Sequence, residues 1–218
     1  MGDITISAVE RAIKATSATV LRNEDHFSNL DALAGDGDFG ASLAAGFRVI
    51  EVELPNLDKS NIGAFLLKLS MIISKHVGGS SGPLWGTAFM RAGMLCKDKT
   101  SISLTDLEAI ITAAIEGIQQ RGGAQPGDKT LIDVMIPVRD VIGQHARGDG
   151  DNNAALRDAT KAAEDAAETA KSWVARRGRQ QFTGDRSSGT PDPGMVALAT
   201  ILADLCTEFG VSRTAAAA

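Results

Sequence analysis

The chain contains no tyrosine, and aromatic residues make up only 4% of its 218 residues. A core built from this composition has to be aliphatic and rich in alanine. The two cysteines, Cys96 and Cys206, stand outside any Cys-x-x-Cys pattern, which excludes a disulfide framework and a cysteine zinc site. We expect both side chains to be reduced thiols in the core.

Long apolar runs are also missing, and the N-terminus has no signal-peptide pattern. The sequence therefore predicts a cytoplasmic protein with no membrane partner. A net charge of −5 argues against a general role in binding nucleic acid. No linker or internal repeat divides the chain, so we interpret residues 1–218 as a single domain.

Hydrophobic periodicity is helical along nearly the whole chain, and no segment alternates as a strand would. Apolar positions predict helices within 4–20, 43–50, 62–73, 83–94, 107–118, 131–141, 153–174 and 195–209. Short loops between them make neighbouring helices antiparallel. The predicted fold class is all-α, a single-domain barrel or bundle of about eight antiparallel helices, with residues 211–218 as a flexible tail.

Three local signals refine these helices. Pro83 suits a first helical turn, where its missing N–H is not needed. Thr105 and Glu108 have the spacing of a capping box. Pro137 predicts a kink or local break in the sixth helix, because proline cannot donate the backbone hydrogen bond.

The segment Asp31–Gly40 places Asp31, Asp36 and Asp38 beside glycines, directly before a predicted helix. Crowded carboxylates repel one another, so a chain that keeps them together usually binds a cation there. All-oxygen ligands favour Mg²⁺ or Ca²⁺ over zinc. The alternative is a solvated acidic turn with a capping aspartate. A calcium-binding helical protein ranks low, because the EF-hand spacing and its final glutamate are absent.

Three further glycine-rich loops, within 78–86, 121–130 and 178–194, also precede predicted helices. All four loops precede alternate helices, so an up-down topology brings these helix starts to the same end. Helix N-termini offer backbone N–H groups to phosphate. Together with the carboxylates they favour a metal ion and a polyphosphate. The Walker A spacing is absent, so we interpret Lys129 as an exposed lysine in a first helical turn.

The four loops together resemble the L subunit of dihydroxyacetone kinases, the nucleotide-binding DhaL/Dak2-type domain. The resemblance rests on LDALAGDGDFG, GGSSGPLWGT, PGDKTLIDVMIP and GR followed by GDRSSGTPDPG, and it covers essentially the whole chain. It implies a barrel of eight antiparallel helices with ADP or ATP at one end. It also implies that Asp31, Asp36 and Asp38 hold two Mg²⁺ ions.

The resemblance further implies which residues contact the nucleotide: Phe39, Gly40, Ala41, Ser42, Ser80, Ser81, Gly122, Leu131, Arg179, Asp192, Pro193 and Gly194. Catalytic roles fall to Arg179, as a positive charge on the transferring group, and to Asp36 and Asp38, through the ions. Arg186 is interpreted as a structural or interface residue. The family usually has histidine where this chain has Phe39, whose ring either packs under the site or adapts it to another affinity or substrate.

The resemblance implies a kinase that acts as a complex with a K-type substrate-binding subunit. This chain would hold Mg-ADP/ATP and transfer the terminal phosphoryl group to dihydroxyacetone or a similar ketose. The ketose would be held covalently on a histidine of the K-type subunit. His26, His76 and His145 have no motif context for such a role, and we expect them to be structural or on the surface.

Several alternatives stay open at this point. The nucleotide is either recharged by a phosphoryl carrier of the phosphotransferase system or exchanged for ATP. The chain acts either as a monomer or as a homodimer. The ketose is either dihydroxyacetone or another one, such as a tetrulose. A regulatory protein that senses Mg-nucleotide without its own catalysis is the alternative function.

Overall fold

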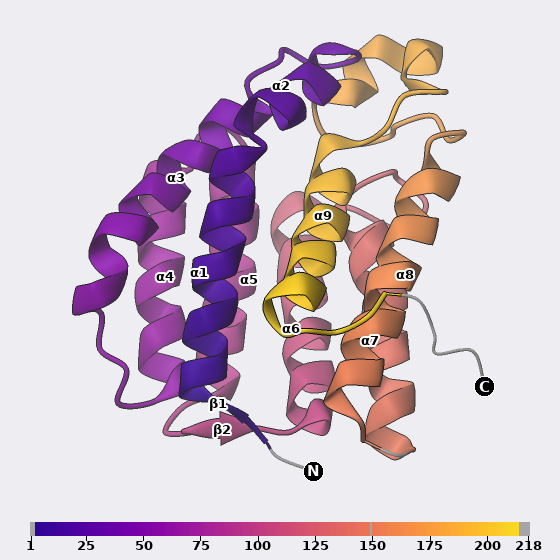
Figure 1. Cartoon of the computed structure of the whole chain (residues 1–218). Coiled ribbons are helices and arrows are strands. Elements are labelled where there is room, and N and C mark those ends of the chain that lie inside the picture. Colours follow the sequence, from indigo (N-terminus) through magenta and orange to yellow (C-terminus); the bar gives the residue numbers. More distant parts are fainter. Residues whose placement is uncertain (1–2, 149, 214–218) are drawn as a thin grey trace.

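The computed structural model describes residues 3–148 and 150–213, and these fold almost entirely into helices (Figure 1). The α-helices are α1 (Ile6–Arg22), α2 (Glu24–Ala32), α3 (Phe39–Glu53), α4 (Ile62–His76), α5 (Ser81–Leu95), α6 (Leu104–Gly122), α7 (Leu131–Arg147), α8 (Asn152–Ala170) and α9 (Pro193–Glu208). The short elements are the 3-10 helices η1 (Leu54–Asn56) and η2 (Arg179–Ser187), and the antiparallel pair β1 (Ile4–Thr5) and β2 (Ser101–Ile102). The all-α prediction is confirmed.

The long helices form a closed ring. Each helix from α3 to α9 packs against the next one, and α1 closes the ring by packing against both α9 and α3. Helix α2 stands apart from this ring and lies across its upper end in Figure 1, where it contacts α3 and α9. The predicted barrel is therefore present. No helix in the described ranges is both long and apolar enough to cross a membrane.

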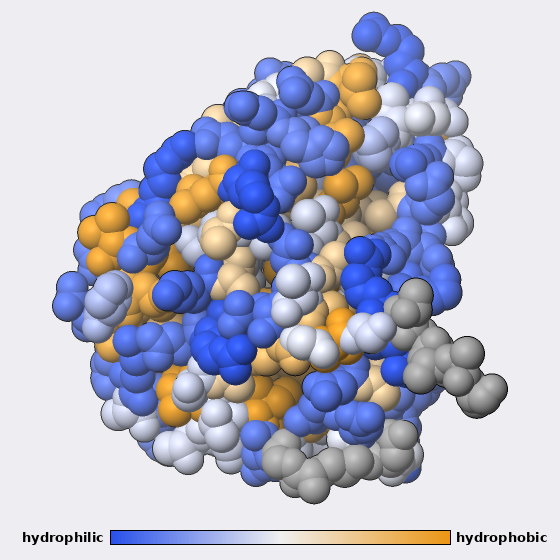
Figure 2. Space-filling model, viewed as in Figure 1, coloured by the Kyte–Doolittle hydropathy of each residue, from blue (hydrophilic) through white to orange (hydrophobic). Residues whose placement is uncertain are grey.

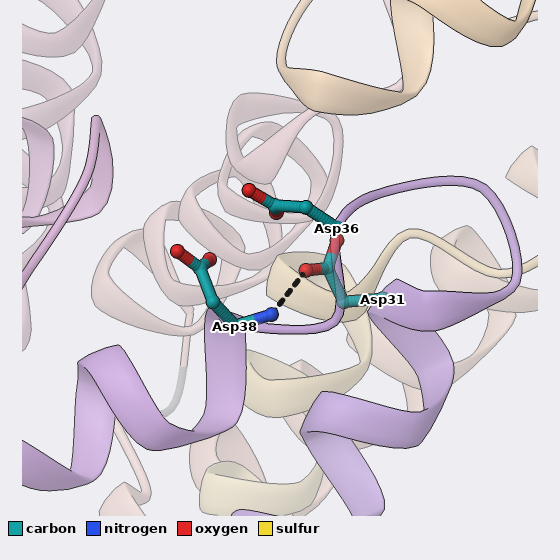
Figure 3. Close-up of side chains that lie close together, drawn as sticks. All are labelled: Asp31, Asp36 and Asp38. Carbon is teal, nitrogen blue, oxygen red and sulfur yellow. Dashed lines mark hydrogen bonds between the residues drawn. The ribbon is translucent and has the colours of Figure 1, made fainter.

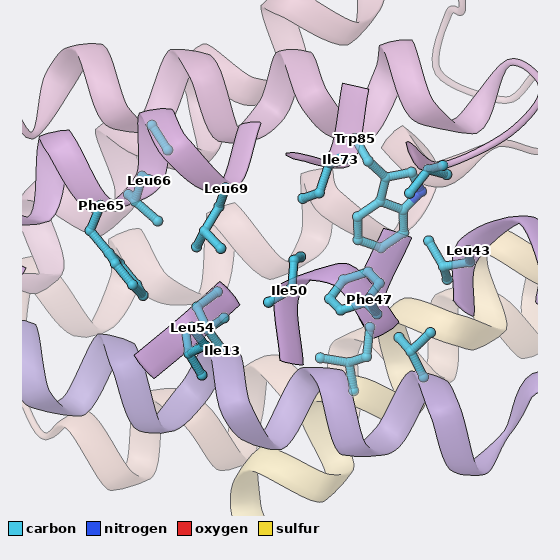
Figure 4. Close-up of a cluster of buried hydrophobic side chains, with 14 of the residues drawn as sticks. Ile13, Leu43, Phe47, Ile50, Leu54, Phe65, Leu66, Leu69, Ile73 and Trp85 are labelled. Carbon is cyan, nitrogen blue, oxygen red and sulfur yellow. The ribbon is translucent and has the colours of Figure 1, made fainter. Parts of the chain in front are cut away.

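The core is aliphatic, as the composition predicts. One cluster lies between α1, α3, α4 and α5 and holds the larger side chains, including Phe47, Phe65 and Trp85 (Figure 4). A second cluster lies where α8 packs against α7 and α9, and α8 contributes a row of buried alanines to it. Cys96 and Cys206 are buried and unpaired, as expected. On the face that carries α1 and α9, hydrophilic side chains are interspersed with pale and hydrophobic patches (Figure 2).

Helix α2 was not predicted. Its nine residues offer few apolar side chains to a periodic pattern, and of these Phe27 is fully buried. The segment is held instead by tertiary contacts with α3 and α9. This short helix matters for function, because Asp31 lies in its last turn.

Other local predictions were wrong in detail. The capping box is formed by Ser103 and Asp106 rather than Thr105 and Glu108, because α6 begins earlier, at Leu104. Helix α7 runs through Pro137 without a break, since Val134 and Val138 on either side are buried against the core. Helix α8 ends at Ala170 rather than at 174.

The C-terminal segment was predicted to be a flexible tail from residue 211. Residues 211–213 have no regular secondary structure, but Arg213 pairs with Glu164 on α8. The backbone N–H of Val211 also donates to the carbonyl of Cys206 at 2.7 Å. The rest of that segment, 214–218, lies outside the described residues.

Candidate functional site

The N-terminal ends of α3, α5, α7 and α9 meet at one end of the barrel, around a cavity of about 640 Å³. The up-down topology requires this arrangement, because the four helices alternate around the ring. The cavity is lined by most of the residues that the resemblance implies: Asp31, Asp38, Phe39, Ser42, Ser80, Ser81, Gly122, Leu131, Arg179, Asp192, Pro193 and Gly194. Asp36, Gly40 and Ala41 lie beside this lining rather than in it.

Asp31 organises the loop between α2 and α3. Its side chain is almost fully buried, and its Oδ2 accepts a hydrogen bond from the backbone N–H of Asp38 at 3.1 Å (Figure 3). The same oxygen accepts from the backbone N–H of Phe39 at 3.3 Å. The loop passes so close that a Cβ on Gly35 would lie 2.1 Å from Asp31 Oδ1. Glycine at position 35 therefore allows the loop to fold around a buried carboxylate.

Asp36 and Asp38 are exposed and complete a cluster with Asp31. One carboxylate oxygen from each lies within 4.8 Å of the others. Burial raises the pKa of Asp31, and the nearby charge of Asp36 raises it further, while backbone hydrogen bonds to Phe39, Gly37 and Asp38 lower it. Three carboxylates around one point fit a hard divalent cation such as Mg²⁺, which offsets their mutual repulsion.

Arg179, the first residue of η2, brings a positive charge to this cluster. Its guanidinium pairs closely with Asp36 and lies 3.7 Å from Asp38 Oδ2. It is also near the turn before α5, because a Cβ on Gly79 would lie 3.8 Å from Arg179 Nη2. The guanidinium of Arg179 therefore lies between the carboxylates and the N-terminus of α5.

The start of α3 supports the carboxylates more directly than it presents donors to a ligand. The N–H of Phe39 donates to Asp31, and the N–H of Ala41 donates to Ser28 Oγ at 3.2 Å. The half-buried ring of Phe39 packs edge-on against Phe27, with ring centroids 6.4 Å apart. This geometry favours the interpretation that Phe39 packs under the site.

The start of α5 is suited to an anion. Gly79 has a φ of 61°, which favours glycine, and Ser80 and Ser81 follow at the start of the helix. The side chain of Ser80 caps no backbone N–H of this helix. Helix N-termini attract anions through their unpaired N–H groups and the helix dipole.

The opposite wall combines α6, α7 and α9. Asp192 caps α9 by accepting from the N–H of Met195 at 2.8 Å, and Pro193 follows at the first helical position. One buried oxygen in the cavity lining, Gln180 Oε1 on η2, has no hydrogen-bond partner among the described residues. An unpaired buried oxygen is costly, so a polar ligand in the cavity would satisfy it.

Lys129 was predicted to be exposed, and this was wrong. Its side chain is 1% exposed, and its Nζ donates to the carbonyls of Ser187 at 2.7 Å and Trp173 at 3.1 Å. These carbonyls belong to the connection between α8 and α9, far along the chain. Backbone carbonyls carry no sequence signature, so no local signal could have found this contact.

Two further basic residues, Arg121 and Arg177, also line the cavity, whereas Arg186 does not. Arg186 is exposed on η2. None of the described histidines is among the lining residues, and His145 pairs with Asp158 Oδ2 at 3.0 Å on the side of the barrel. The site therefore combines carboxylates and helix N-termini with three arginines, Arg121, Arg177 and Arg179.

The carboxyl of Asp192, a half-buried residue that lines the cavity, predicts a pH effect. Burial raises its pKa from 3.8 to about 6, so the folded state binds this proton more tightly than the unfolded chain. The stability gained from it is present at low pH and is lost as pH rises from about 4 to about 6. A pKa difference of about two units corresponds to at most about 3 kcal/mol. Asp192→Asn keeps a capping oxygen but cannot ionise. Between about pH 4 and 6 the free energy of unfolding in urea should fall in the wild type, relative to this variant, by up to this amount.

Parallel pH profiles for the two proteins between pH 4 and 7 would contradict this assignment. They would mean that Asp192 is as well solvated in the folded barrel as in the unfolded chain.

Comparison with known proteins places this chain in a family. The model of the DAK2 domain matches residues 33–207. The chain is 35% identical to the PEP-dependent dihydroxyacetone kinase ADP-binding subunit DhaL of Escherichia coli, over 80% of this chain and 83% of that one. It is 36% identical to the L-erythrulose 1-kinase of Mycolicibacterium smegmatis, over 83% of this chain but 32% of that protein.

A solved structure agrees with these matches. The dihydroxyacetone kinase from C. freundii in complex with AMP-PNP and Mg²⁺ superimposes with a TM-score of 0.74 and 25% identity. The match covers 95% of this chain and 35% of that one, so the chain spans about a third of the larger kinase. The resemblance inferred from the four loops is confirmed, and the chain belongs to the DAK2-domain family.

Proposed function

We propose that the chain is the nucleotide-binding subunit of a dihydroxyacetone-type kinase. In this role it holds ADP or ATP with Mg²⁺ and passes the terminal phosphoryl group to a short ketose bound on a separate K-type subunit. The main support is the convergence of three carboxylates, four helix N-termini and Arg179 on one cavity. The relatives from E. coli and M. smegmatis are both named as kinases.

Each part of the cavity has a role in this proposal. Asp31, Asp36 and Asp38 would hold two Mg²⁺ ions, which when bound neutralise charge on the phosphoryl oxygens. The start of α5, with Ser80 and Ser81, binds phosphate through N–H and hydroxyl donors. A volume of about 640 Å³ lies within the range of small-molecule sites.

Arg179 acts on the transferring group. In the structure its guanidinium neutralises part of the charge of Asp36 and Asp38. The same position, between the carboxylates and the start of α5, lets it place a positive charge beside the phosphoryl group. Phosphoryl transfer depends mainly on such positioning and charge stabilisation.

The names of the relatives support a choice of acceptor and of phosphoryl donor. The E. coli relative is named as PEP-dependent, so we propose that a phosphoryl carrier protein recharges the bound ADP, in the cytoplasm where such carriers work. Dihydroxyacetone is the proposed acceptor. L-erythrulose is the second candidate, because the M. smegmatis relative is named for it.

Calorimetric titration of the nucleotide-stripped chain with ADP, with and without Mg²⁺, tests the proposal. We expect tight binding only with Mg²⁺, and a loss of affinity of at least about a hundredfold in Asp36→Ala, because one ligand carboxylate is removed. Turnover is then measured with a K-type partner and each ketose. Absence of binding under both conditions would contradict the nucleotide site. Binding without turnover would favour a regulatory protein.

A further inference from the structure

The connection between α8 and α9 is pinched at its base. Residues 171–175 and 187–189, here called the neck, lie side by side: the N–H of Gly189 donates to the carbonyl of Lys171 at 2.7 Å. The N–H of Ala175 donates to Ser187 Oγ at 2.8 Å. Residues 178–186, here called the tip, extend from the neck to the cavity near α2 (Figure 1). The tip carries Arg179.

Lys129, which lies in the loop before α7, connects the two segments of the neck. Its ammonium donates to the carbonyl of Ser187 at 2.7 Å on one half, and to those of Trp173 at 3.1 Å and Lys171 at 3.4 Å on the other. An ammonium has three protons and no acceptor, so three carbonyls match it fully. The contact crosses from the loop before α7 to a segment more than forty residues later.

The preceding residue, Asp128, makes further contacts with the same connection. The N–H of Arg176 donates to the carbonyl of Asp128 at 3.0 Å, and Arg177 Nε lies 3.8 Å from Asp128 Oδ2. Asp128 and Lys129 therefore hold the neck and the residues that lead from it to the tip. The carboxyl of Asp192, at the start of α9, adds a favourable charge beside the ammonium.

Two features of Lys129, its buried ammonium and its backbone conformation, are energetically unfavourable. A buried ammonium is unfavourable unless it is fully hydrogen-bonded, and burial lowers the pKa of Lys129. Lys129 also has a φ of 63°, a backbone conformation that residues other than glycine seldom adopt. Strained and buried polar groups of this kind concentrate where a structure has to fix a functional segment.

We propose that Lys129 is a positioning residue for the phosphoryl-transfer site. Its ammonium fixes the neck and thereby aims Arg179 at Asp36, Asp38 and the start of α5. Lys129 is not among the cavity-lining residues, so it acts through the tip rather than by touching a ligand. The proposal rests on the proposed function for its catalytic meaning, but the fixing of the tip can be tested alone.

Limited proteolysis with trypsin tests the neck without any ligand. Arg177, Arg179 and Arg186 in and beside the tip are cleavage sites. We expect Lys129→Met to speed cleavage at these sites about tenfold, as local opening becomes easier, while cleavage within α8 and α9 stays unchanged. Lys171→Met is the matched control, because it removes an exposed ammonium from the same neck and keeps the backbone carbonyl.

A double-mutant cycle on Mg-ADP affinity tests the link to Arg179. We expect Lys129→Met and Arg179→Ala each to weaken binding about tenfold, and the double variant to be no weaker than either. Multiplied losses, about a hundredfold in the double variant, would overturn the proposal, as would cleavage and affinity equal to wild type. If Lys129→Met does not fold, Lys129→Gln, which keeps two donors without charge, replaces it in both tests with the same criteria.

The two tests separate this proposal from the proposed function. If the wild-type chain fails to bind Mg-ADP, the proposed function fails, and the trypsin result still decides whether Lys129 holds the neck. If wild type binds and the Lys129 variant behaves as wild type in both tests, only the positioning role is overturned.

Discussion

Replacing Asp31 by asparagine is expected to abolish Mg-dependent ADP binding while leaving the loop around it in place. The asparagine oxygen can still accept from the N–H groups of Asp38 and Phe39, which keeps the turn before α3. The negative charge is lost, however, and a neutral amide oxygen binds Mg²⁺ more weakly than a carboxylate oxygen does. Calorimetric titration should show a loss of affinity of at least about a hundredfold.

The same variant should be more stable than wild type at neutral pH. Burial raises the pKa of Asp31, so ionisation of this carboxyl destabilises the folded state. That penalty is absent at low pH, where the group is protonated in both states, and appears as pH rises through the carboxyl range. The melting temperature of Asp31→Asn should therefore exceed that of wild type at pH 7, and the two should converge towards pH 4.

Asp140→Asn is the control for both measurements. Asp140 is exposed on α7 and pairs with Arg139, so its replacement should change neither ADP affinity nor the pH dependence of stability. Wild-type affinity in Asp31→Asn would show that Asp31 is not a metal ligand. Lower stability at neutral pH would show that the charged carboxylate is favoured where it lies.

The barrel could be predicted because its helices are long and periodic. Leu43, Phe47 and Ile50 repeat along α3, and all three are buried in the structure. The position of the site could also be predicted, because glycine-rich loops before alternate helices must meet at one end. The expectation required only an up-down topology, which the ring from α3 to α9 has.

What the sequence could not predict depends on contacts between distant segments. Helix α2 is short, and its buried Phe27 is matched by Phe39 in the next helix rather than by neighbours in its own. Lys129 looks like a surface lysine, because its partners are backbone carbonyls of Trp173 and Ser187. Both segments support the carboxylates or Arg179, so the missed features lie directly behind the predicted ones.

Replacing Gly40 by alanine should unfold this support. Gly40 lies in the first turn of α3, and a Cβ there would lie 2.0 Å from the carbonyl oxygen of Glu24 and 2.7 Å from the N–H nitrogen of Ser28. Both are backbone atoms of α2, so the clash can be relieved only by moving that helix, and Asp31 with it. We expect a loss of about 3 kcal/mol in the free energy of unfolding, measured in urea, and loss of Mg-dependent ADP binding.

Gly143→Ala provides a matched comparison, because the added Cβ meets a neighbouring atom at a similar distance but that atom can move away. A Cβ on Gly143 in α7 would lie 2.1 Å from Glu108 Oε1, nearly the same distance, but this atom ends a flexible side chain. Glu108 and its partner Arg147 can swing away, and alanine favours a helix over glycine by about 1 kcal/mol. The variant should therefore keep wild-type stability within about 1 kcal/mol and bind Mg-ADP normally. Equal losses in both variants would mean that α2 is no more rigidly held than a side chain, and the close packing of α2 on α3 would not be what fixes Asp31.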